Sequence, residues 1–291
     1  SRVKMEINDI ALPVGISLKN RYQLRETYYI GPMSIVYMGY DMQTGKQVVI
    51  KEFCPYKLSN RDMDEKSIVC RSNTCKAQFR QYLKGFQQEC EIVKKVSRLT
   101  RPYAKCTLQY VDDFEENATT YLVTEYVEGI SLEECIHSGQ VYSVRNCMLS
   151  LVRIVKQLHK LGIIHRDIKP ANIMIRPDGN VVLIDFGSAC YKGKESVPLQ
   201  FVSRGYSAPE LYDGRPSGYQ TDIYSIGVLL YYLLTDYQLP APDEMEGEEV
   251  PDISEFHPIP PKLEAAIMGA IERDPAKRMQ SLKKLEHVLM A

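Results

Sequence analysis

The side chains best suited to chemistry are gathered in the segment 165–187. Two short apolar runs, 172–175 and 181–185, are separated by a stretch dense in Pro, Asp and Gly, which predicts that they pair as an antiparallel hairpin. Asn172 and Asp185 would then lie close together at the open end of that hairpin. An amide oxygen and a carboxylate suit Mg²⁺, a hard cation that takes its remaining ligands from water and substrate phosphates. We therefore expect a substrate that carries phosphate groups.

Asp167 precedes Asn172 by five residues, so its carboxylate would lie over the same point. A carboxylate in that place can accept the proton of a hydroxyl nucleophile, and Lys169 adds a cation nearby. A single aspartate is more often a solvated surface residue than a catalytic one. The joint pattern of Asp167, Asn172 and Asp185 favours the catalytic interpretation.

Composition sets the class of protein. The chain has 291 residues, which suggests two domains or one two-lobed domain, and its 44% hydrophobic and 25% charged residues are average for a globular protein. A formal net charge of −1 provides no field for nucleic acid or an acidic membrane, so neither is expected as a partner. Eight cysteines are too sparse for a disulfide scaffold, and no basic-then-apolar leader opens the sequence. We expect a cytoplasmic protein, with any membrane tether outside this sequence.

The elements that must position these residues divide the chain into a strand-rich front and a helix-rich back. We predict a three-stranded antiparallel meander over 22–51, an irregular surface insertion over 52–85, and a helix over 86–99. Two further strands are predicted over 110–114 and 121–126, and a helix over 144–161 that ends at Gly162. The predicted domains are an N-terminal extension (1–20), a small lobe (21–125) and a large lobe (126–291).

The run His165-Arg166-Asp167-Ile168-Lys169-Pro170-Ala171-Asn172, followed by Asp185-Phe186-Gly187, resembles the catalytic loop and the metal-binding motif of protein kinases. The resemblance extends over nearly the whole chain, through Val48-Val49-Ile50-Lys51, Ala208-Pro209-Glu210, Asp222 and Arg278. It implies an α+β, two-lobed protein kinase fold, with an antiparallel sheet and one main helix in the small lobe, a larger helical lobe, and ATP in the cleft.

The resemblance also implies roles for single residues. Asp167 would orient a hydroxyl and accept its proton, Lys169 would neutralise charge on the moving phosphoryl group, and Asn172 and Asp185 would hold Mg²⁺ or Mn²⁺. Lys51 would hold the α- and β-phosphates of ATP, fixed by a helix glutamate.

Two glutamates compete for the partnership with Lys51. Glu89 is preferred to Glu91 because apolar residues follow Glu89 at the third, fourth and seventh positions, which places it on the inward stripe of the helix. The remaining residues that the resemblance assigns to the nucleotide site are Gly31, Val36, Val49, the gatekeeper Thr124, the hinge residues Glu125 and Val127, and Met174.

The glycine-rich loop departs from the family pattern. Aligning Val36 with the valine of that pattern places Tyr29, Gly31 and Ser34 at its three glycine positions, so only one glycine survives. Side chains hinder the close approach of backbone amides to phosphate, and Pro32 has no amide N–H to donate. We therefore expect weaker ATP binding or a reshaped loop.

The resemblance narrows to serine/threonine kinases through Lys169 and Ser203, and to bacterial eukaryotic-like members through Leu12-Pro13-Val14-Gly15 and Ile50-Lys51-Glu52-Phe53-Cys54-Pro55. It implies protein substrates with serine or threonine acceptors. The segment 185–210 contains no threonine, so Ser196 is the candidate site for an activating phosphate that Arg166 would bind.

Two other functions remain open at this point: a pseudokinase that binds nucleotide or partners with little turnover, and an enzyme that transfers another group on the same fold. Some residues have structural interpretations. His165 is expected to pack against Phe186, Glu210 to pair with Arg278, and Asp222 to cap a helix and hold backbone amides.

Several charged or sulfur-bearing residues lie outside the motifs. A zinc site at Cys70 and Cys75 is disfavoured because no second tight pair accompanies them. The acidic tract 243–249 is interpreted as solvated loop. The same interpretation is given to the basic residues of the insertion, which are Lys57, Arg61, Lys66, Arg71, Lys76, Arg80 and Lys84.

Overall fold

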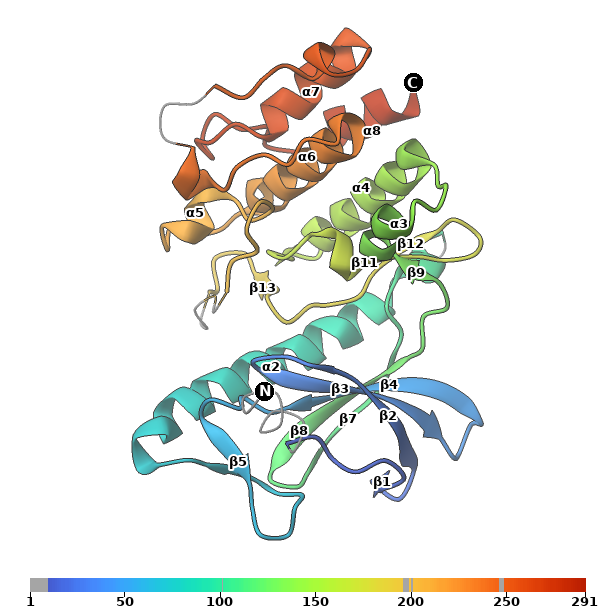
Figure 1. The fold of residues 1–291 in the computed structure, drawn as a ribbon, viewed down its shortest axis with the longest axis vertical. Helices are drawn as coiled ribbons and strands as arrows, with labels where there is room; N and C mark the ends of the chain where they lie inside the picture. The colour runs from blue at the N-terminus through green and yellow to red at the C-terminus, as the bar shows by residue number, and fades with distance from the viewer. Residues whose placement is uncertain (1–9, 101, 196–198, 200, 246–248) are drawn as a thin grey trace. The chain divides into compact units, whose positions relative to one another are not determined.

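The computed structural model describes residues 10–100, 102–195, 199, 201–245 and 249–291 (Figure 1). The chain forms two compact units. The N-terminal unit contains the residues up to Ser97 and Leu108–Tyr126, and the C-terminal unit contains Arg98–Thr107 and Val127–Ala291. The division into domains at residues 20 and 125 stays a prediction.

The N-terminal unit is built on an antiparallel sheet with the strand order β1-β2-β3-β4-β8-β7. The predicted meander is confirmed by β2, β3 and β4, and the two later strands by β7 and β8. The strands of this sheet are β1 (Ser17–Leu18), β2 (Tyr22–Ile30), β3 (Ser34–Asp41), β4 (Lys46–Phe53), β7 (Tyr110–Glu116) and β8 (Thr119–Glu125).

Burial alternates along β3, whereas β8 is buried on both faces. In β3, Ile35 and Tyr37 are buried, and Val36 and Met38, which alternate with them, lie on the opposite, partly exposed face. A period of two is what a half-buried strand requires. One face of β3 therefore packs into the core of the unit, and the other is partly exposed.

The segment after β4 contains more regular structure than predicted. It holds a hairpin of β5 (Ser59–Arg61) and β6 (Ile68–Cys70), the 3-10 turn η1 (Asn73–Cys75), and α2 (Lys76–Ser97). The prediction of an irregular stretch over 52–85 was wrong, and so was the predicted start of the helix at residue 86. The helical signal was present but missed, because Phe79, Tyr82, Leu83 and Phe86 recur at helical spacing. Phe79 packs against Phe53 with ring centroids 5.3 Å apart.

Arg61 corrects a second expectation about this segment. Its side chain is 9% exposed and Nη1 donates to Glu52 Oε2 at 2.9 Å, so it is not a solvated loop residue. Nε of Arg61 also donates to the carbonyl of Ile10 at 2.7 Å. Tyr37 and Tyr121 donate their hydroxyls to the same Glu52 carboxylate. Arg61 therefore anchors the β5–β6 hairpin and the chain near Ile10 to the core of the sheet.

The C-terminal unit is mainly helical, and Figure 1 shows α4, α6 and α7 side by side. Its helices are α3 (Leu132–Ser138), α4 (Val144–Lys160), α5 (Pro209–Tyr212), α6 (Tyr219–Thr235), α7 (Pro261–Ala270) and α8 (Lys283–Met290). The short strands are β9 (Ile130–Ser131), β10 (Ile163–Ile164), β11 (Ile173–Ile175), β12 (Val181–Leu183) and β13 (Cys190–Tyr191). The 3-10 turns are η2 (Tyr103–Cys106), η3 (Pro170–Asn172), η4 (Pro242–Glu244) and η5 (Ile253–Glu255).

Two helices show how this core is built. α4 begins at Ser143, whose hydroxyl accepts from the amide of Asn146, and stops before Gly162 at φ +78°, as predicted. α6 is buried along most of its length, and at Gly227 a Cβ would lie 2.7 Å from the Cβ of Ala270 in α7. The glycine is required because the two helices approach too closely for a side chain.

In the part of the chain that the structure describes, no helix combines the length and hydropathy needed to cross a bilayer. Within the same residues, no group of three or more His, Cys, Asp or Glu side chains is arranged to hold a metal ion.

Candidate active site

The segment 165–172 folds into a loop whose polar side chains converge on Asp167. Nδ2 of Asn172 donates to Oδ2 of Asp167 at 3.0 Å and to its backbone carbonyl at 2.8 Å. Ser203 Oγ donates to the other carboxylate oxygen, Oδ1, at 2.6 Å. Nζ of Lys169 donates to Ser203 Oγ at 3.1 Å and lies 3.8 Å from Oδ1 of Asp167. Donors at both oxygens fix the orientation of the carboxylate.

The backbone of this loop is held from α6. The amides of His165 and Arg166 each donate to the carboxylate of Asp222 at 2.9 Å, and Nε2 of His159 lies 2.9 Å from the same group. Burial alone would raise the pKa of Asp222, but its hydrogen bonds outweigh burial and hold the pKa below its usual range. The expectation that Asp222 holds backbone amides is confirmed.

One part of that expectation was wrong: the N-cap of α6 is Gly218, and Asp222 lies a turn further along. Arg166 adopts φ +67°, a left-handed conformation that costs free energy for a residue other than glycine. The two bonds to Asp222 therefore hold a strained backbone at the entry to the loop.

His165 has the structural place that the sequence predicts. Its Nδ1 accepts from the amide of Asp167 at 3.1 Å, and its ring meets Phe186 edge to face with centroids 5.1 Å apart. It therefore links the catalytic loop to the Asp185-Phe186-Gly187 motif without facing Asp167's carboxylate.

The two predicted metal ligands flank the hairpin of β11 and β12. Ile173 pairs with Leu183, and the amide of Ile184 donates to the carbonyl of Asn172 at 3.0 Å, so the chain at Asn172 lies beside the residue that precedes Asp185. The side-chain nitrogen of Asn172 is engaged by Asp167, so its side-chain oxygen is the atom that could bind a cation. Oδ1 of Asp185 accepts from the amide of Gly187 at 2.8 Å. This pair of oxygen donors fits a hard divalent cation.

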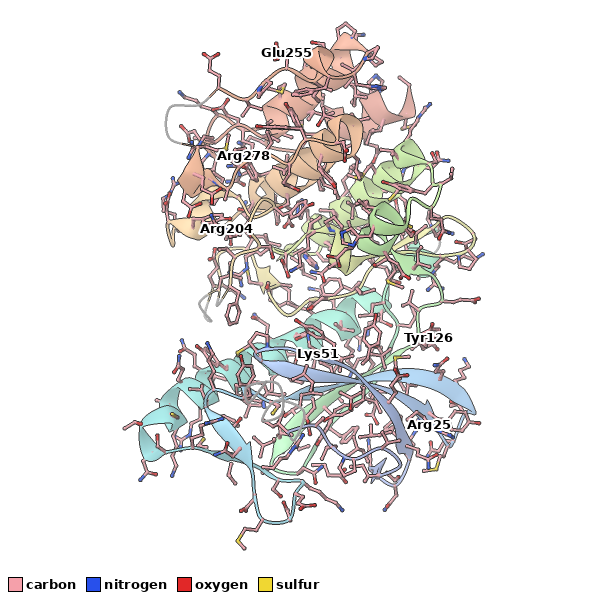
Figure 2. All side chains as sticks on the ribbon, in the orientation of Figure 1. Arg25, Lys51, Tyr126, Arg204, Glu255 and Arg278 are labelled. Carbon is pink, nitrogen blue, oxygen red and sulfur yellow. The ribbon has the colours of Figure 1, made fainter. Side chains whose placement is uncertain are left out.

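The N-terminal unit holds the predicted phosphate-binding lysine. Lys51, labelled in Figure 2, places Nζ 2.7 Å from Oε2 of Glu89, and the two side chains are 17% and 6% exposed. Glu91 lies on the exposed side of α2. The structure therefore pairs Lys51 with Glu89, the residue on the inward stripe of the helix.

Strand register places other predicted nucleotide residues on the face that carries Lys51. Val36 is paired with Lys51, and Val49 is paired with Thr124. Directly paired residues of antiparallel strands point to the same side, and Lys51 and Val49 lie two positions apart on β4. Gly31 lies in the turn that follows β2, and Glu125 ends β8.

Two of the predicted nucleotide residues lie in the other unit. Val127 is buried there, and Met174 is paired with Val182 on one side and Ser131 on the other.

The segment after Gly187 contains a residue that the sequence analysis missed. Oε2 of Glu195 lies 3.6 Å from Nη1 of Arg166, and Glu195 also accepts from the amide and hydroxyl of Ser217, each at 2.7 Å. Nε of Arg166 donates to the carbonyl of Ser188 at 2.6 Å. The sequence did hold a signal for this contact, because Glu195 is an acidic residue in the segment that was expected to bring an anion to Arg166. Ser196, the predicted phosphorylation site, lies outside the described residues.

The predicted pair of Glu210 and Arg278 is present and fully buried. Nη1 and Nη2 of Arg278 donate to the two oxygens of Glu210 at 2.8 and 3.0 Å. Thr221 Oγ1 donates to Oε2 of Glu210 at 3.0 Å. A bidentate pair fixes both distance and orientation, so it ties the start of α5 to the C-terminal helices.

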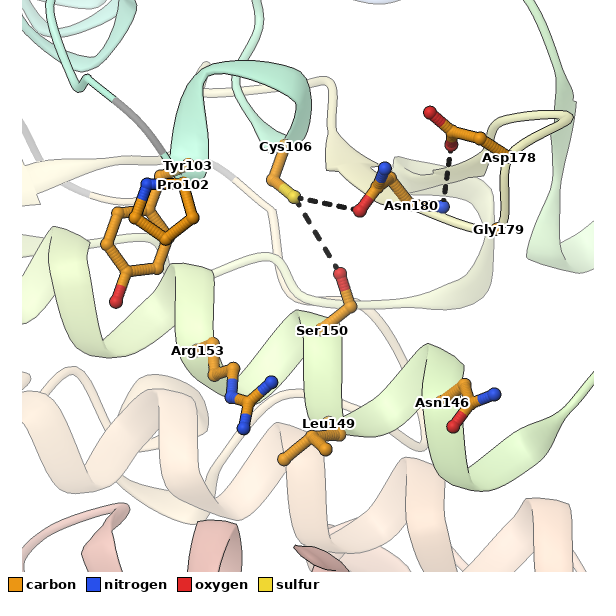
Figure 3. Close-up of a pocket in the computed structure, with 10 residues that line it drawn as sticks. All are labelled: Pro102, Tyr103, Cys106, Asn146, Leu149, Ser150, Arg153, Asp178, Gly179 and Asn180. Carbon is orange, nitrogen blue, oxygen red and sulfur yellow. Dashed lines mark hydrogen bonds between the residues drawn. The ribbon is translucent and has the colours of Figure 1, made fainter.

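A pocket of about 360 Å³ in the C-terminal unit contains none of the predicted site residues (Figure 3). It is bounded by η2, α4 and the β11–β12 turn, and Cys106 lies in it with Sγ 3.9 Å from Ser150 Oγ. Burial raises the pKa of the Cys106 thiol, which keeps it protonated at neutral pH. The pocket therefore offers no activated nucleophile at this cysteine.

The model of the protein kinase domain matches residues 22–290, which include the catalytic loop, the metal-binding motif and the lysine–glutamate pair described above. The chain belongs to the protein kinase family. Most of the curated relatives that it matches carry the name serine/threonine-protein kinase.

Three similarities illustrate this. The probable serine/threonine-protein kinase of Streptomyces coelicolor is 29% identical, over 92% of this chain and 39% of that protein. Serine/threonine-protein kinase D of Synechocystis is 30% identical, over 95% of this chain and 53% of that protein. The solved apo form of PpkA-294 has a TM-score of 0.78 and 25% identity, covering 97% of this chain and 99% of that one. The chain thus spans about half or less of these curated relatives.

Proposed function

We propose that this chain transfers the γ-phosphoryl group of ATP to serine or threonine hydroxyls of protein substrates, with Mg²⁺ as the metal and Mn²⁺ as a substitute. The observation that carries the proposal is the arrangement at Asp167, where one carboxylate oxygen accepts from Ser203 and the other from Asn172. A carboxylate held in this way can receive the proton of an incoming hydroxyl.

The C-terminal unit supplies the groups that act on the acceptor and the metal. In this proposal Asp167 orients the hydroxyl and accepts its proton, and Lys169 offsets negative charge on the phosphoryl group as it moves. Asn172 and Asp185 provide the oxygen ligands for the metal, which supplies charge neutralisation at the phosphates. Catalysis then consists of positioning and electrostatic stabilisation.

The N-terminal unit supplies the groups that bind the nucleotide. Lys51, held by Glu89, neutralises the α- and β-phosphates, and its position depends on an ion pair that is largely withdrawn from water. Val36, Val49 and Thr124 form the apolar part of the same face, against which a purine ring can pack. Glu125 of this unit, and Val127 and Met174 of the C-terminal unit, are the remaining residues that we assign to nucleotide binding.

The alternative of a kinase-like protein without turnover is favoured neither by the comparisons nor by the described residues. We also propose that the protein works in the cytoplasm, because its eight cysteines are all free thiols. Burial raises the pKa of six of these thiols, at Cys54, Cys90, Cys106, Cys135, Cys147 and Cys190.

The proposal is tested by separating binding from transfer. Replacing Asp167 by Asn keeps the shape of the side chain and removes the base, so Asp167→Asn should bind ATP and Mg²⁺ with the affinity of the natural chain and lose phosphoryl transfer to a generic basic protein. Asp178→Asn, a change at an exposed aspartate of the β11–β12 turn, serves as the matched control and should keep full activity. Full transfer by Asp167→Asn would show that the base is assigned wrongly.

A further inference from the structure

The turn between β2 and β3 has few amides to offer to phosphate. The amide of Gly31 already donates to the carbonyl of Ser34 at 2.8 Å, and Pro32 has no amide N–H. The carbonyl of Met33 accepts from the amide of Cys54 at 3.0 Å, which anchors the turn to the end of β4. Neither Gly31 nor Pro32 can therefore donate an amide N–H to a nucleotide bound under this turn.

A bulge in β2 brings Tyr29 onto the face that carries Lys51. Thr27 is paired with Tyr37, but Tyr29 is paired with Val36, so Tyr28 is an extra residue in β2. Without that extra residue the alternation of the strand would direct Tyr29 to the opposite face. Tyr29 is paired with Val36, and Val36 is paired with Lys51, so the three residues form one row across the sheet.

The dimensions of the row suit a phosphate. Neighbouring strands are about 4.8 Å apart, so the Cα atoms of Tyr29 and Lys51 are separated by roughly 10 Å, and their long side chains can reach opposite sides of one anion. Tyr29 is 57% exposed, and its hydroxyl has no hydrogen-bond partner within the described part of the chain.

Gly31 makes room for the ring of Tyr29. A Cβ at residue 31 would lie 2.9 Å from Cε1 of Tyr29, closer than carbon atoms approach. The tyrosine ring thus leans along β2 over the turn, and the surviving glycine of this loop is the residue that allows it to do so.

From this geometry we propose that Tyr29 is a nucleotide-binding residue, whose phenolic hydroxyl donates a hydrogen bond to a phosphate oxygen of the nucleotide that Lys51 holds. The inference rests on the proposed function, because it presumes a nucleotide on this face of the sheet. It makes the side chain of Tyr29 a hydrogen-bond donor to phosphate. The amide of Gly31 cannot take this role because it is already engaged, and Pro32 has no amide N–H.

The test is the affinity of the purified chain for ADP and for adenosine, measured by titration calorimetry with Mg²⁺ present. Tyr29→Phe removes only the hydroxyl, so it should weaken ADP binding by roughly threefold to tenfold and leave adenosine binding unchanged. Tyr28→Phe is the matched control, since Tyr28 is an exposed tyrosine of the same strand, and it should bind both ligands like the natural chain.

A second pair of variants tests the place of the ring. Gly31→Ala should also weaken ADP binding, because the added Cβ displaces the ring, and it should cause no further loss once Tyr29 has been replaced by Leu. Equal ADP affinity of Tyr29→Phe and the natural chain, or an equal loss for ADP and adenosine, would overturn the role of the hydroxyl. Tighter ADP binding by Tyr29→Gly would show instead that the ring obstructs the site.

The results that would overturn the proposed function differ from those that would overturn only the role of Tyr29. A natural chain that binds neither ADP nor ATP would overturn the assignment of the nucleotide face, and the role of Tyr29 with it. A natural chain that binds ADP and loses this affinity in Lys51→Ala, while Tyr29→Phe is unaffected, would leave the proposed function intact and reject only the tyrosine.

Discussion

At the scale of single residues, the site consists of side chains held by more than one partner. Asp167 is fixed by donors at both oxygens, and Ser203 is shared between Asp167 and Lys169. Ser203 comes from a segment far along the chain, so its hydroxyl connects the catalytic loop to that segment. The orientation of the proposed base therefore depends on this hydroxyl together with the amide of Asn172.

Ser203→Ala should lower kcat about tenfold, because it frees one oxygen of Asp167 and removes the partner of Lys169. The KM for ATP should not change, since neither contact involves Lys51 or Glu89. Ser203→Thr keeps the hydroxyl and should retain most of the activity. Steady-state kinetics of the two variants measures kcat and KM. A kcat of Ser203→Ala equal to that of Ser203→Thr would argue against a role of the Ser203 hydroxyl in orienting Asp167.

Sequence alone identified the residues that belong to motifs, including Asp167, Asn172 and the choice of Glu89 over Glu91. It did not identify Glu195 or the anchoring role of Arg61. Both residues act through partners distant in the sequence, and no local pattern distinguishes a buried arginine from a solvated one until the fold brings Glu52 beside it.

At the scale of elements, ion pairs secure the edges of the sheet on which Lys51 stands. Arg21 at the start of the sheet donates through Nε and Nη2 to the two oxygens of Asp41 at the end of β3, at 3.0 and 2.9 Å. The hydrogen bond from Arg21 lowers the pKa of Asp41 to about 2. The meander was predictable from its alternation. The start of α2 was predictable too, from Phe79, Tyr82, Leu83 and Phe86 at helical spacing, but the polar residues around them led to the interpretation of this segment as irregular.

A depressed folded-state pKa means that the stabilisation by Asp41 is present above the unfolded-state value of about 4 and is lost as the pH falls toward about 2. Asp41→Asn should therefore lower the free energy of unfolding at pH 7 by about 1–2 kcal/mol, with the difference from the natural chain shrinking below pH 4. Thermal unfolding between pH 7 and pH 3 measures this. A difference independent of pH would contradict the ion-pair account.

Breaking the ion pair of Arg61 and Glu52 should lower the free energy of unfolding more than Asp41→Asn does. Arg61→Met leaves the Glu52 carboxylate buried without its cation, so the free energy of unfolding should fall by about 3–5 kcal/mol. Adding Glu52→Gln should recover part of that loss. Lys57→Met, at an exposed lysine of the same segment, is the control and should be nearly neutral. Denaturant unfolding of the three variants measures these differences. A loss of free energy of unfolding in Arg61→Met as small as that in Lys57→Met would show that Arg61 behaves as a surface residue.

At the scale of the whole molecule, each unit brings its own part of the chemistry, and buried pairs hold the C-terminal unit together around α6. Asp222 of α6 holds the backbone at Arg166, and Arg278 fixes Glu210. The contact between Arg166 and Glu195 links the catalytic loop to the segment that follows the metal-binding motif. Glu195 of that segment thus supplies an anionic partner for Arg166.

Because Glu195 already contacts Arg166, the chain should be active without prior phosphorylation. Glu195→Gln removes the charge, keeps the shape, and should lower kcat severalfold while leaving ADP affinity unchanged. The assay uses protein pretreated with a phosphatase, and Glu249→Gln serves as the control at a distant acidic residue. Loss of all activity on phosphatase treatment of the natural chain would show that phosphate, at Ser196 or elsewhere, is the required anion.

The most direct test of the central claim is transfer of label from γ-labelled ATP with Mg²⁺ to a generic basic protein, followed by identification of the labelled amino acids. We predict label on serine or threonine with the natural chain, full activity in Asp178→Ala, and none in Asp185→Ala, because the last variant lacks a metal ligand. Equal labelling by the natural chain and Asp185→Ala, or no labelling by a natural chain that binds ATP, would contradict the assignment of an active serine/threonine kinase.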